Sequence, residues 1–172
     1  TSFSEDSALG TIIATSSVAD PESNTITYSL TGPGSDYFSV DENGNVTLKD
    51  SLDFETYSNY EITLVASDGE LTTSSVITFD ISDVDEAPSL SSTLKSESFE
   101  ESIAVGTALA TISSVDPESQ TITYSLSGTG SENFEIDSKG NITSKVTFDY
   151  ETDTSYTFNV TASDGTNSTT SP

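Results

Sequence analysis

Cysteine, histidine, methionine and tryptophan are absent from this sequence of 172 residues, and lysine and arginine together number only four. Without cysteine there is no disulfide framework and no thiolate chemistry. Without histidine or cysteine, zinc, copper and iron–sulfur sites lose their usual ligands. Without a basic surface the chain cannot displace counterions from phosphate, so we expect neither nucleic acid nor an anionic membrane surface as a partner.

Long apolar segments are also absent, because no run approaches the roughly 18 apolar residues of a membrane span, and no signal peptide is visible. We therefore expect no direct insertion into a membrane. The sequence pattern begins and stops in the middle of a repeat, so we expect the chain to be part of a longer protein.

Acidic residues and aromatic residues are what the sequence does contain. The net charge is −25, and an acidic chain with few aromatics is often disordered. Here seven tyrosines and eight phenylalanines fall at regular places within an alternation of apolar and polar residues. This pattern predicts folded β-strands rather than disorder.

An internal repeat is the strongest feature of the sequence. Residues 1–76 align with residues 97–172 without a gap, an offset of 96 residues that places Phe3 on Phe99, and about half of the aligned positions are identical. The segment 20–23 (Asp-Pro-Glu-Ser) recurs as 116–119, and the six-residue run 25–30 recurs as 121–126. A period of this length corresponds to a whole domain rather than to one turn of a solenoid.

Every secondary-structure signal within one repeat predicts β-strands. Short segments rich in Thr, Val, Ile and Tyr cover 11–17, 25–30, 37–40, 45–48, 59–67 and 71–81. In the segment 59–67 the alternation predicts that Tyr60, Ile62, Leu64 and Ala66 face the core. The segments 41–45 and 67–70 predict hairpin turns that use Gly and Asn where φ is positive.

The number of strands predicts the fold class. With a first strand near Phe3, each repeat has about seven strands, as a Greek-key sandwich does. We therefore predict an all-β chain of two tandem, immunoglobulin-like Greek-key β-sandwich domains, spanning 1–88 and 89–172, with a linker at 83–88. Repeat 2 has no counterpart of the segment that ends repeat 1, so we expect its final strand to be missing or incomplete.

Acidic residues recur in five places in repeat 1: Glu5, the pair Asp53 and Glu55, the linker 83–86, the turn 20–22, and Asp68. Ca²⁺ takes about six to eight oxygen ligands, mostly carboxylates and carbonyls. Closely spaced carboxylates repel one another, and a bound divalent ion relieves that repulsion. Calcium is the favoured metal, and Mg²⁺ stays open because it also binds oxygen ligands.

The order of these motifs resembles the cadherin repeat. The resemblance rests on Glu5, on the sequence Leu-Asp-Phe-Glu at 52–55 and on Asp-Val-Asp-Glu-Ala-Pro at 83–88, followed by Asp-Pro-Glu at 116–118 and by Asp164. It covers essentially the whole chain, twice. Because the chain has no Trp, the tryptophan strand exchange of vertebrate cell–cell cadherins is excluded. With the Ser/Thr/Asp-rich sequence, this is similar to the cadherin-like repeats of large bacterial (RTX-type) surface adhesins.

The resemblance implies where calcium binds. The inter-repeat ligands would be Glu5, Asp53, Glu55, Asp83, Asp85, Glu86, Asp116, Glu118 and Asp164. A boundary upstream would use Asp20, Glu22 and Asp68. A boundary downstream would use Glu101, Asp149 and Glu151. Phe54 stands where the family has a basic residue, and Glu118 stands where it has Asp, so the ligand details differ from the family pattern.

Simpler interpretations of the acids stay open at this point. They could form a solvated acidic surface, Asp68 and Asp164 could serve only their Asp-Gly turns, and the segment 20–22 could be an ordinary loop. A pair of carboxylates can also catalyse glycoside hydrolysis. The pairs here recur in both repeats without Trp or His, and no nucleophile–base set accompanies them, so we do not expect an enzyme.

The resulting functional expectation is mechanical. Calcium at the repeat junction would lock the sandwiches into a rod, which extends an adhesin from an extracellular, bacterial cell surface. The partners would be neighbouring repeats of the same chain, with a surface ligand or like repeats on other cells as further candidates. The alternatives are a module that binds carbohydrate, peptide or a like repeat, and a split domain that carries an inserted ligand-binding domain.

Overall fold

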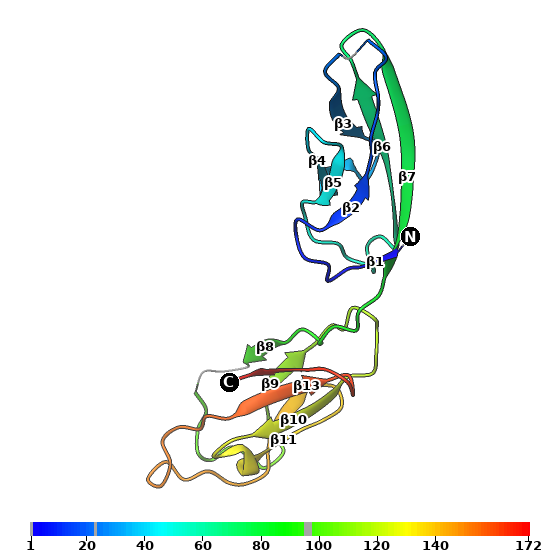
Figure 1. Cartoon of the computed structure of the whole chain (residues 1–172). Coiled ribbons are helices and arrows are strands. Elements are labelled where there is room, and N and C mark those ends of the chain that lie inside the picture. The colour runs from blue at the N-terminus through cyan, green and yellow to red at the C-terminus, as the bar shows by residue number, and fades with distance from the viewer. Residues whose placement is uncertain (1, 23, 95–97) are drawn as a thin grey trace. The chain divides into compact units, whose positions relative to one another are not determined.

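The computed structural model describes residues 2–22, 24–94 and 98–172. The chain divides into two compact units, Thr1–Val84 and Asp85–Pro172, which we call unit 1 and unit 2 (Figure 1). Each unit is a β-sandwich, and this confirms the predicted all-β fold class. Among the described residues, no helix has the length and apolar character that crossing a membrane requires.

Among its described residues, unit 1 contains seven strands and one 3₁₀ turn. They are β1 (Ser2–Ser4), β2 (Ile12–Thr15), β3 (Thr27–Thr31), η1 (Ser35–Tyr37), β4 (Phe38–Val40), β5 (Asn45–Leu48), β6 (Asn59–Ser67) and β7 (Thr72–Ser82). One sheet has the order β1-β7-β6-β3 and the other has the order β2-β5-β4. The connections from β2 to β3 and from β3 to β4 pass from one sheet to the other, as Greek-key connections do.

The core of unit 1 lies between its two sheets and follows the predicted alternation. Tyr60, Ile62, Leu64 and Ala66 of β6 are all buried, which confirms the predicted inward face of this strand. β6 and β7 pair in antiparallel register over nine positions, from Asn59 to Ser67. Because successive side chains of a strand point to opposite faces, this long pairing carries the inward face of β7 into the same core.

The turn between β4 and β5 also forms as predicted. The side chain of Asp41 accepts hydrogen bonds from the backbone N–H of Asn43 (2.9 Å) and Asn45 (2.8 Å), and from the Asn45 side-chain amide (2.8 Å). These hydrogen bonds, that of the Asn45 side chain first, lower the pKa of Asp41. The carboxylate is therefore occupied by its own turn, as that of Asp137 is in the equivalent turn of unit 2.

Unit 2 also contains seven strands among its described residues. They are β8 (Ser91–Leu94), β9 (Ala108–Ser113), β10 (Thr123–Ser127), β11 (Phe134–Ile136), β12 (Asn141–Ser144), β13 (Asn159–Ser163) and β14 (Ser168–Ser171), with the turn η2 (Ser131–Asn133). Its sheets have the orders β10-β13-β14 and β11-β12-β9-β8.

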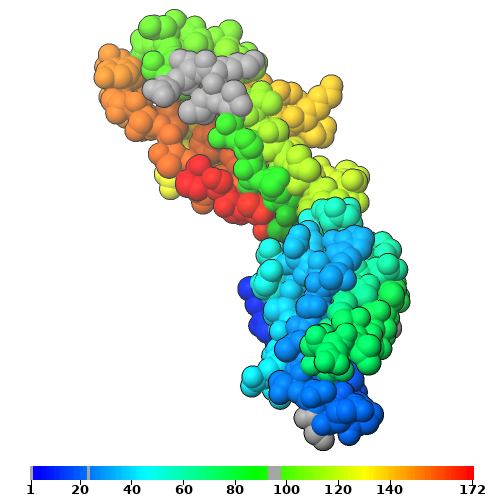
Figure 2. Space-filling model, turned by 90° about the horizontal axis from the view of Figure 1, so that it is seen from above, coloured from blue at the N-terminus to red at the C-terminus, as the bar shows by residue number. Residues whose placement is uncertain are grey.

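The first and last strands distinguish the two units. In unit 1 the first strand, β1, pairs in parallel with β7, whereas in unit 2 the first strand, β8, pairs antiparallel with β9. β14 has four residues where β7 has eleven, and it lies on the surface of unit 2, coloured red in Figure 2. β13 has five residues, whereas β6 has nine.

Candidate metal centre

Glu5 organises one end of unit 1. It follows β1 directly, and its side chain is 8% exposed. Its two carboxylate oxygens accept hydrogen bonds from the backbone N–H of Phe54 (2.7 Å) and Val84 (2.6 Å). Both segments that flank these residues are predicted to supply calcium ligands. A single buried carboxylate therefore holds the motif 52–55 and the end of β7 at one place.

Three carboxylates converge at that place. Glu5, Glu55 and Asp83 each present an oxygen, and these three oxygens lie within 4.8 Å of one another. Glu55 and Asp83 are exposed, whereas Glu5 is buried. Three negative groups at this spacing repel one another, and a divalent cation with a preference for oxygen ligands matches the set. The structure thus brings together three of the predicted ligands from segments that are distant in sequence.

Asp53, in contrast, serves its own turn. Its two carboxylate oxygens accept hydrogen bonds from the backbone N–H (2.8 Å) and the hydroxyl (2.9 Å) of Thr56. These bonds fix the turn that contains Glu55. Asp53 therefore helps to position Glu55 without being one of the three clustered carboxylates. Its role as a direct calcium ligand stays a prediction.

Unit 2 repeats this arrangement with Glu101, Asp149 and Glu151. Oxygens of the three side chains lie within 4.8 Å of one another, and all three side chains are exposed. Glu101 accepts a hydrogen bond from the backbone N–H of Tyr150 (2.9 Å), as Glu5 does from Phe54. Hydrogen bonds, that of the Thr152 hydroxyl first, lower the pKa of Asp149 and keep it charged. The predicted downstream ligands therefore form a second acidic cluster within unit 2.

The turn 116–118 of unit 2 encloses carboxylate oxygens. Asp116 is 6% exposed, and one of its oxygens accepts a hydrogen bond from the backbone N–H of Gln120 (2.7 Å). Ser119 adopts a positive φ of 61°, which closes the turn. Within the described ranges, the second oxygen of Asp116 and both oxygens of Glu118 are buried without a hydrogen-bond partner. Such groups are costly unless an unseen partner satisfies them, and a cation would do so.

Asp164 shares this property. One of its oxygens accepts hydrogen bonds from the backbone N–H of Thr166 and Asn167, both at 2.6 Å, so it forms the predicted turn. Its other oxygen is buried and has no hydrogen-bond partner in the part of the chain that the structure describes. The turn and the ligand interpretations are thus compatible, because each uses a different oxygen.

Asp85 of the linker is held by two amide side chains of unit 2. The Asn167 side-chain amide donates hydrogen bonds to the backbone carbonyl (2.7 Å) and the carboxylate (3.0 Å) of Asp85. The Gln120 amide donates a further short hydrogen bond to the other Asp85 oxygen. Glu86 and Glu118 present oxygens within 4.8 Å of each other. Gln120 and Asn167 also donate their backbone N–H groups to Asp116 and Asp164, so they connect Asp85 with both turns.

Sequence reasoning missed Gln120 and Asn167. They correspond, at the offset of 96 residues, to Asn24 and Leu71 of unit 1. The change from Leu71 in the first repeat to Asn167 in the second could have indicated a binding role for this position. It places a polar side chain in the turn that contains Asp164.

The upstream candidates lie at the other end of unit 1. Asp20 accepts a hydrogen bond from the backbone N–H of Asn24 (2.9 Å), and Asp68 accepts from those of Glu70 (2.8 Å) and Leu71 (2.6 Å). Hydrogen bonds, that of Leu71 first, lower the pKa of Asp68. β7 separates Asp68 from Asp83, and its eleven residues span roughly 35 Å at a rise of about 3.3 Å per residue. Asp20, Glu22 and Asp68 therefore cannot contribute to the cluster around Glu5.

Comparison with known proteins decides the family. A profile of the cadherin domain matches residues 1–89 and again residues 95–172, and so includes nearly the whole chain. The chain belongs to the cadherin domain family. Cadherin domains are extracellular adhesion modules that typically bind calcium at the junctions between domains.

Cadherins of animals are among the similar proteins. The chain is 35% identical over 174 residues to chicken cadherin-related family member 1 and 31% identical over 175 residues to human protocadherin Fat 1. These alignments cover 95% and 94% of the chain, but only 20% and 4% of the relatives. A solved structure of PcdhgB3 EC1-4 aligns with a TM-score of 0.65 at 25% identity, covering 99% of this chain and 45% of that one. The chain thus spans less than half the length of each of these relatives.

Proposed function

We propose that this pair of cadherin domains is a calcium-rigidified extender of a long cell-surface adhesion protein. Calcium ions bind at the junction of the two units and lock tandem sandwiches into a rod. The observation that carries the proposal is the set of buried carboxylate oxygens of Asp116, Glu118 and Asp164 that have no hydrogen-bond partner among the described residues.

The linker supports a junctional position for the ions. Asp83 belongs to the carboxylate cluster of unit 1, and Asp85 is held by the side chains of unit 2. One residue, Val84, separates them, and its backbone N–H is bound by Glu5. A cation that binds either acid therefore acts on the connection between the two units.

The donor set supports calcium as the ion. All the candidate side chains are carboxylates, and the sequence has no histidine or cysteine. Extracellular calcium modules have dissociation constants of roughly 10⁻⁴–10⁻³ M, so sites of this type fill outside cells and empty inside them. Each bound ion brings two positive charges to a chain of net charge −25, which reduces the repulsion between its acids.

The role follows from this chemistry. Without calcium the acids of the linker and of both units repel one another, and the linker flexes. With calcium they share ions, and the junction stiffens. The attribution to a bacterial surface adhesin rests on the absence of tryptophan and on the Ser/Thr/Asp-rich sequence alone, and it stays a prediction.

A calcium titration tests the proposal. Thermal unfolding and small-angle X-ray scattering are recorded in EDTA, in Ca²⁺ and in Mg²⁺ at equal ionic strength. At about 10–100 times the dissociation constant, mass action adds about 1.4–2.7 kcal/mol to the free energy of unfolding. We expect a higher melting temperature in Ca²⁺. We also expect a larger maximum dimension of the particle and a narrower distribution of its dimensions. Equal melting curves and equal scattering in EDTA and Ca²⁺ would show that the acids are only surface charge.

A further inference from the structure

The sequence Asn-x-Ser/Thr, in which x is not proline, occurs four times in the chain, beginning at Asn45, Asn141, Asn159 and Asn167. It is the acceptor sequence for N-linked oligosaccharides in secreted proteins, where it lies on the surface. Cadherin domains are extracellular modules, so the chain belongs to a class of proteins that can receive this modification. The structure distinguishes the four asparagines, because their side chains differ in exposure and in hydrogen bonding.

Three of the four side-chain amides already donate hydrogen bonds. The amides of Asn45 and Asn141 each donate to the aspartate four residues earlier, at 2.8 and 2.9 Å, and both side chains are partly buried. The Asn167 amide donates both to the backbone carbonyl (2.7 Å) and to the carboxylate (3.0 Å) of Asp85. An oligosaccharide replaces one of the two amide hydrogens, so at Asn167 it would remove one of these hydrogen bonds.

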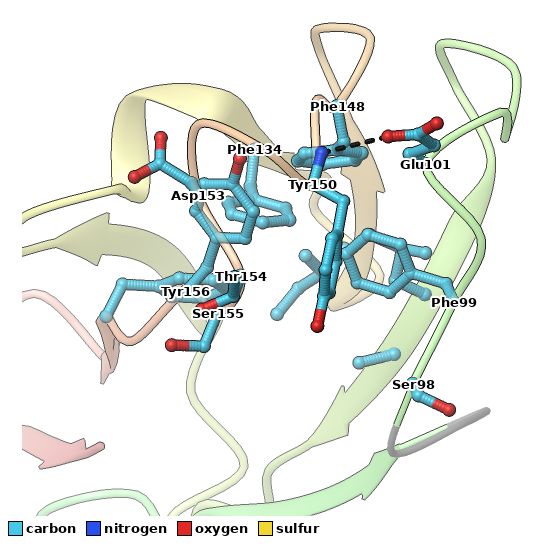
Figure 3. Close-up of a pocket in the computed structure, with 14 residues that line it drawn as sticks. Ser98, Phe99, Glu101, Phe134, Phe148, Tyr150, Asp153, Thr154, Ser155 and Tyr156 are labelled. Atoms are coloured by element: carbon cyan, nitrogen blue, oxygen red, sulfur yellow. Dashed lines mark hydrogen bonds between the residues drawn. The ribbon is translucent and has the colours of Figure 1, made fainter.

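Asn159 differs from the other three. It is the first residue of β13, its side chain is exposed, and this side chain makes no hydrogen bond to any residue that the structure describes. Its neighbours face inward: the Phe158 ring lies 4.7 Å from that of Phe134, which also contacts Tyr156 (Figure 3), and Val160 is buried. Because successive side chains of an extended chain point to opposite faces, Asn159 projects from the outer face of the sheet.

Small, uncharged side chains surround Asn159 on that outer face. Its antiparallel partner on β10 is Ser127, and the next residue along β10 is Gly128, which has no side chain. The other residues that β10, β13 and β14 place on this face are Thr123, Ser125, Thr161, Ser163, Ser168 and Thr170. None of these residues carries a charge, although the net charge of the chain is −25. These strands therefore leave room for an oligosaccharide on Asn159.

The equivalent position in unit 1 shows that this face points to solvent beside a longer strand as well. Asn159 corresponds, at the offset of 96 residues, to Thr63 of β6, whose partner on β7 is Val76. β7 continues from Val76 to Ser82, and Val76 is still 59% exposed. The exposure of the outer face thus does not depend on the length of the neighbouring strand.

The sequence around Asn159 also favours the transfer of an oligosaccharide. The donor is an oligosaccharide linked to a polyprenyl diphosphate, so negative charges beside the acceptor repel it. An acid lies within four residues of each of the other three asparagines: Asp41, Asp137 and Asp164. The segment 155–163 around Asn159, in contrast, contains no charged residue.

We propose that Asn159 is the N-glycosylation site of unit 2. In the transfer, the side-chain nitrogen of Asn159 forms a bond to C1 of the first sugar and loses one proton, and the bond from that sugar to the diphosphate breaks, so that polyprenyl diphosphate leaves. The oligosaccharide then covers the outer face of the sheet β10-β13-β14 beside its edge strand β10. A covered edge does not pair with a strand of another molecule, so we expect the modification to prevent association through this sheet.

Secretion from a cell that glycosylates its proteins tests the site. The 172-residue chain is expressed behind a cleavable signal peptide in a human cell line, and its intact mass is measured before and after treatment with peptide-N-glycosidase F. We expect most molecules to lose the mass of one oligosaccharide, and we expect peptide mapping to find that the enzyme has converted Asn159 to aspartate. An unchanged mass, or an oligosaccharide on another asparagine with Asn159 unmodified, would overturn the proposal.

Three variants provide the controls. Thr161→Ala removes the acceptor sequence at a partly exposed position and keeps Asn159, and we expect a secreted chain without the oligosaccharide. Thr161→Ser keeps the acceptor sequence, and Asn45→Gln removes a different one, so both should retain the oligosaccharide. Retention in Thr161→Ala, or loss in Asn45→Gln, would contradict the assignment to Asn159. The mass does not depend on calcium, so the result is independent of the proposed calcium-dependent function.

Discussion

The carboxylate of Glu5 accepts a hydrogen bond of 2.6 Å from the backbone N–H of Val84, which lies 79 residues later in the chain. Val84 is the last residue of unit 1, so this bond ties the start of the unit to its end. The other oxygen of Glu5 binds the backbone N–H of Phe54. The geometry of the acidic cluster in unit 1 therefore depends on a single buried side chain.

Glu5→Gln tests that dependence. The amide that replaces one carboxylate oxygen cannot accept a hydrogen bond, so one of the two backbone N–H groups loses its partner. We expect the free energy of unfolding of unit 1 to fall by about 1–3 kcal/mol, measured by urea denaturation in EDTA. Glu61→Gln on the exposed side of β6 is the matched control and should change stability by less than about 0.5 kcal/mol. Equal effects of the two substitutions would contradict the structural role of Glu5.

Glu55→Gln separates metal binding from stability. Glu55 is exposed and contributes an oxygen to the cluster with Glu5 and Asp83. Removing its charge relieves repulsion without calcium and removes a ligand with calcium. We therefore expect unchanged or slightly higher stability in EDTA and an affinity for calcium reduced about tenfold, measured by calorimetry. Glu70→Gln, in the turn at the other end of β7, should leave the affinity unchanged, and a similar loss there would place the ion elsewhere.

Asn167→Leu tests how unit 2 holds the linker. The substitution introduces the residue of the equivalent position in unit 1, Leu71, and removes the two hydrogen bonds to Asp85. We expect a severalfold weaker affinity for calcium, since each hydrogen bond that orients a ligand contributes about 0.5–1.5 kcal/mol. Ser168→Thr also introduces the residue of unit 1, and it should have no effect. If both variants bind calcium like the parent chain, the contact with Asp85 does not orient a ligand.

Gly44 marks a position where the backbone has no room for a side chain. Its φ is 76°, and a Cβ placed on it would lie 2.5 Å from the carbonyl oxygen of Ser16. We expect Gly44→Ala to destabilise unit 1 by about 2–4 kcal/mol in thermal unfolding, because left-handed strain adds to the steric clash. Gly69→Ala has a similar φ of 101° and open space around it, so it should cost only about 1–2 kcal/mol. A reversed order would show that the turn can relax around the new methyl group.

We expect the protein to lose stability in alkaline solution because of the buried side chain of Tyr60. Burial, followed by the influence of Tyr37, raises the pKa of Tyr60 from 10.0 to about 12. The unfolded chain therefore releases this proton first as the pH rises. The protonated hydroxyl of Tyr60 makes its full contribution to the free energy of unfolding below about pH 10. This contribution is lost between about pH 10 and pH 12, and the loss is on the order of 3 kcal/mol.

Denaturation at a series of pH values, with tyrosinate absorbance recorded in parallel, measures this effect. Tyr60→Phe should remove most of the pH dependence of unit 1 between about pH 10 and pH 12. The matched change in unit 2, Tyr156→Phe, should have a smaller effect, because Tyr156 is less buried. The same slope in the parent chain and in Tyr60→Phe would show that other groups control the alkaline transition.

Much of the fold could be predicted from local patterns in the sequence. The alternation in 59–67 placed Tyr60, Ile62, Leu64 and Ala66 in the core, and all four are buried. The Asp-Gly and Asn-Gly turns formed where they were expected, since their side chains bind their own backbone. These features depend on residues that are close in sequence, and so they are visible without a structure.

The site was predictable only in part. The offset of 96 residues brought the acids into equivalent pairs, but it could not show that Asp53 binds Thr56 while Glu55 joins Glu5 and Asp83. Nor could it show that Gln120 and Asn167 hold Asp85. Which of two neighbouring carboxylates faces a cluster depends on the hydrogen bonds of the turn, and these form only in the folded chain.

The sequence by itself determined the all-β class, the two repeats, the acidic groups that recur in both of them, and the family that its motifs resemble. The tertiary structure decided the pairing of the first and last strands: β1 lies beside β7 in unit 1, whereas β8 lies beside β9 in unit 2. It also decided that Phe79 of β7 is surrounded by the rings of Phe3, Phe38 and Tyr60. The physical reason is that composition and alternation are local properties, whereas a strand's neighbour and the contents of a core depend on contacts between residues far apart in the chain.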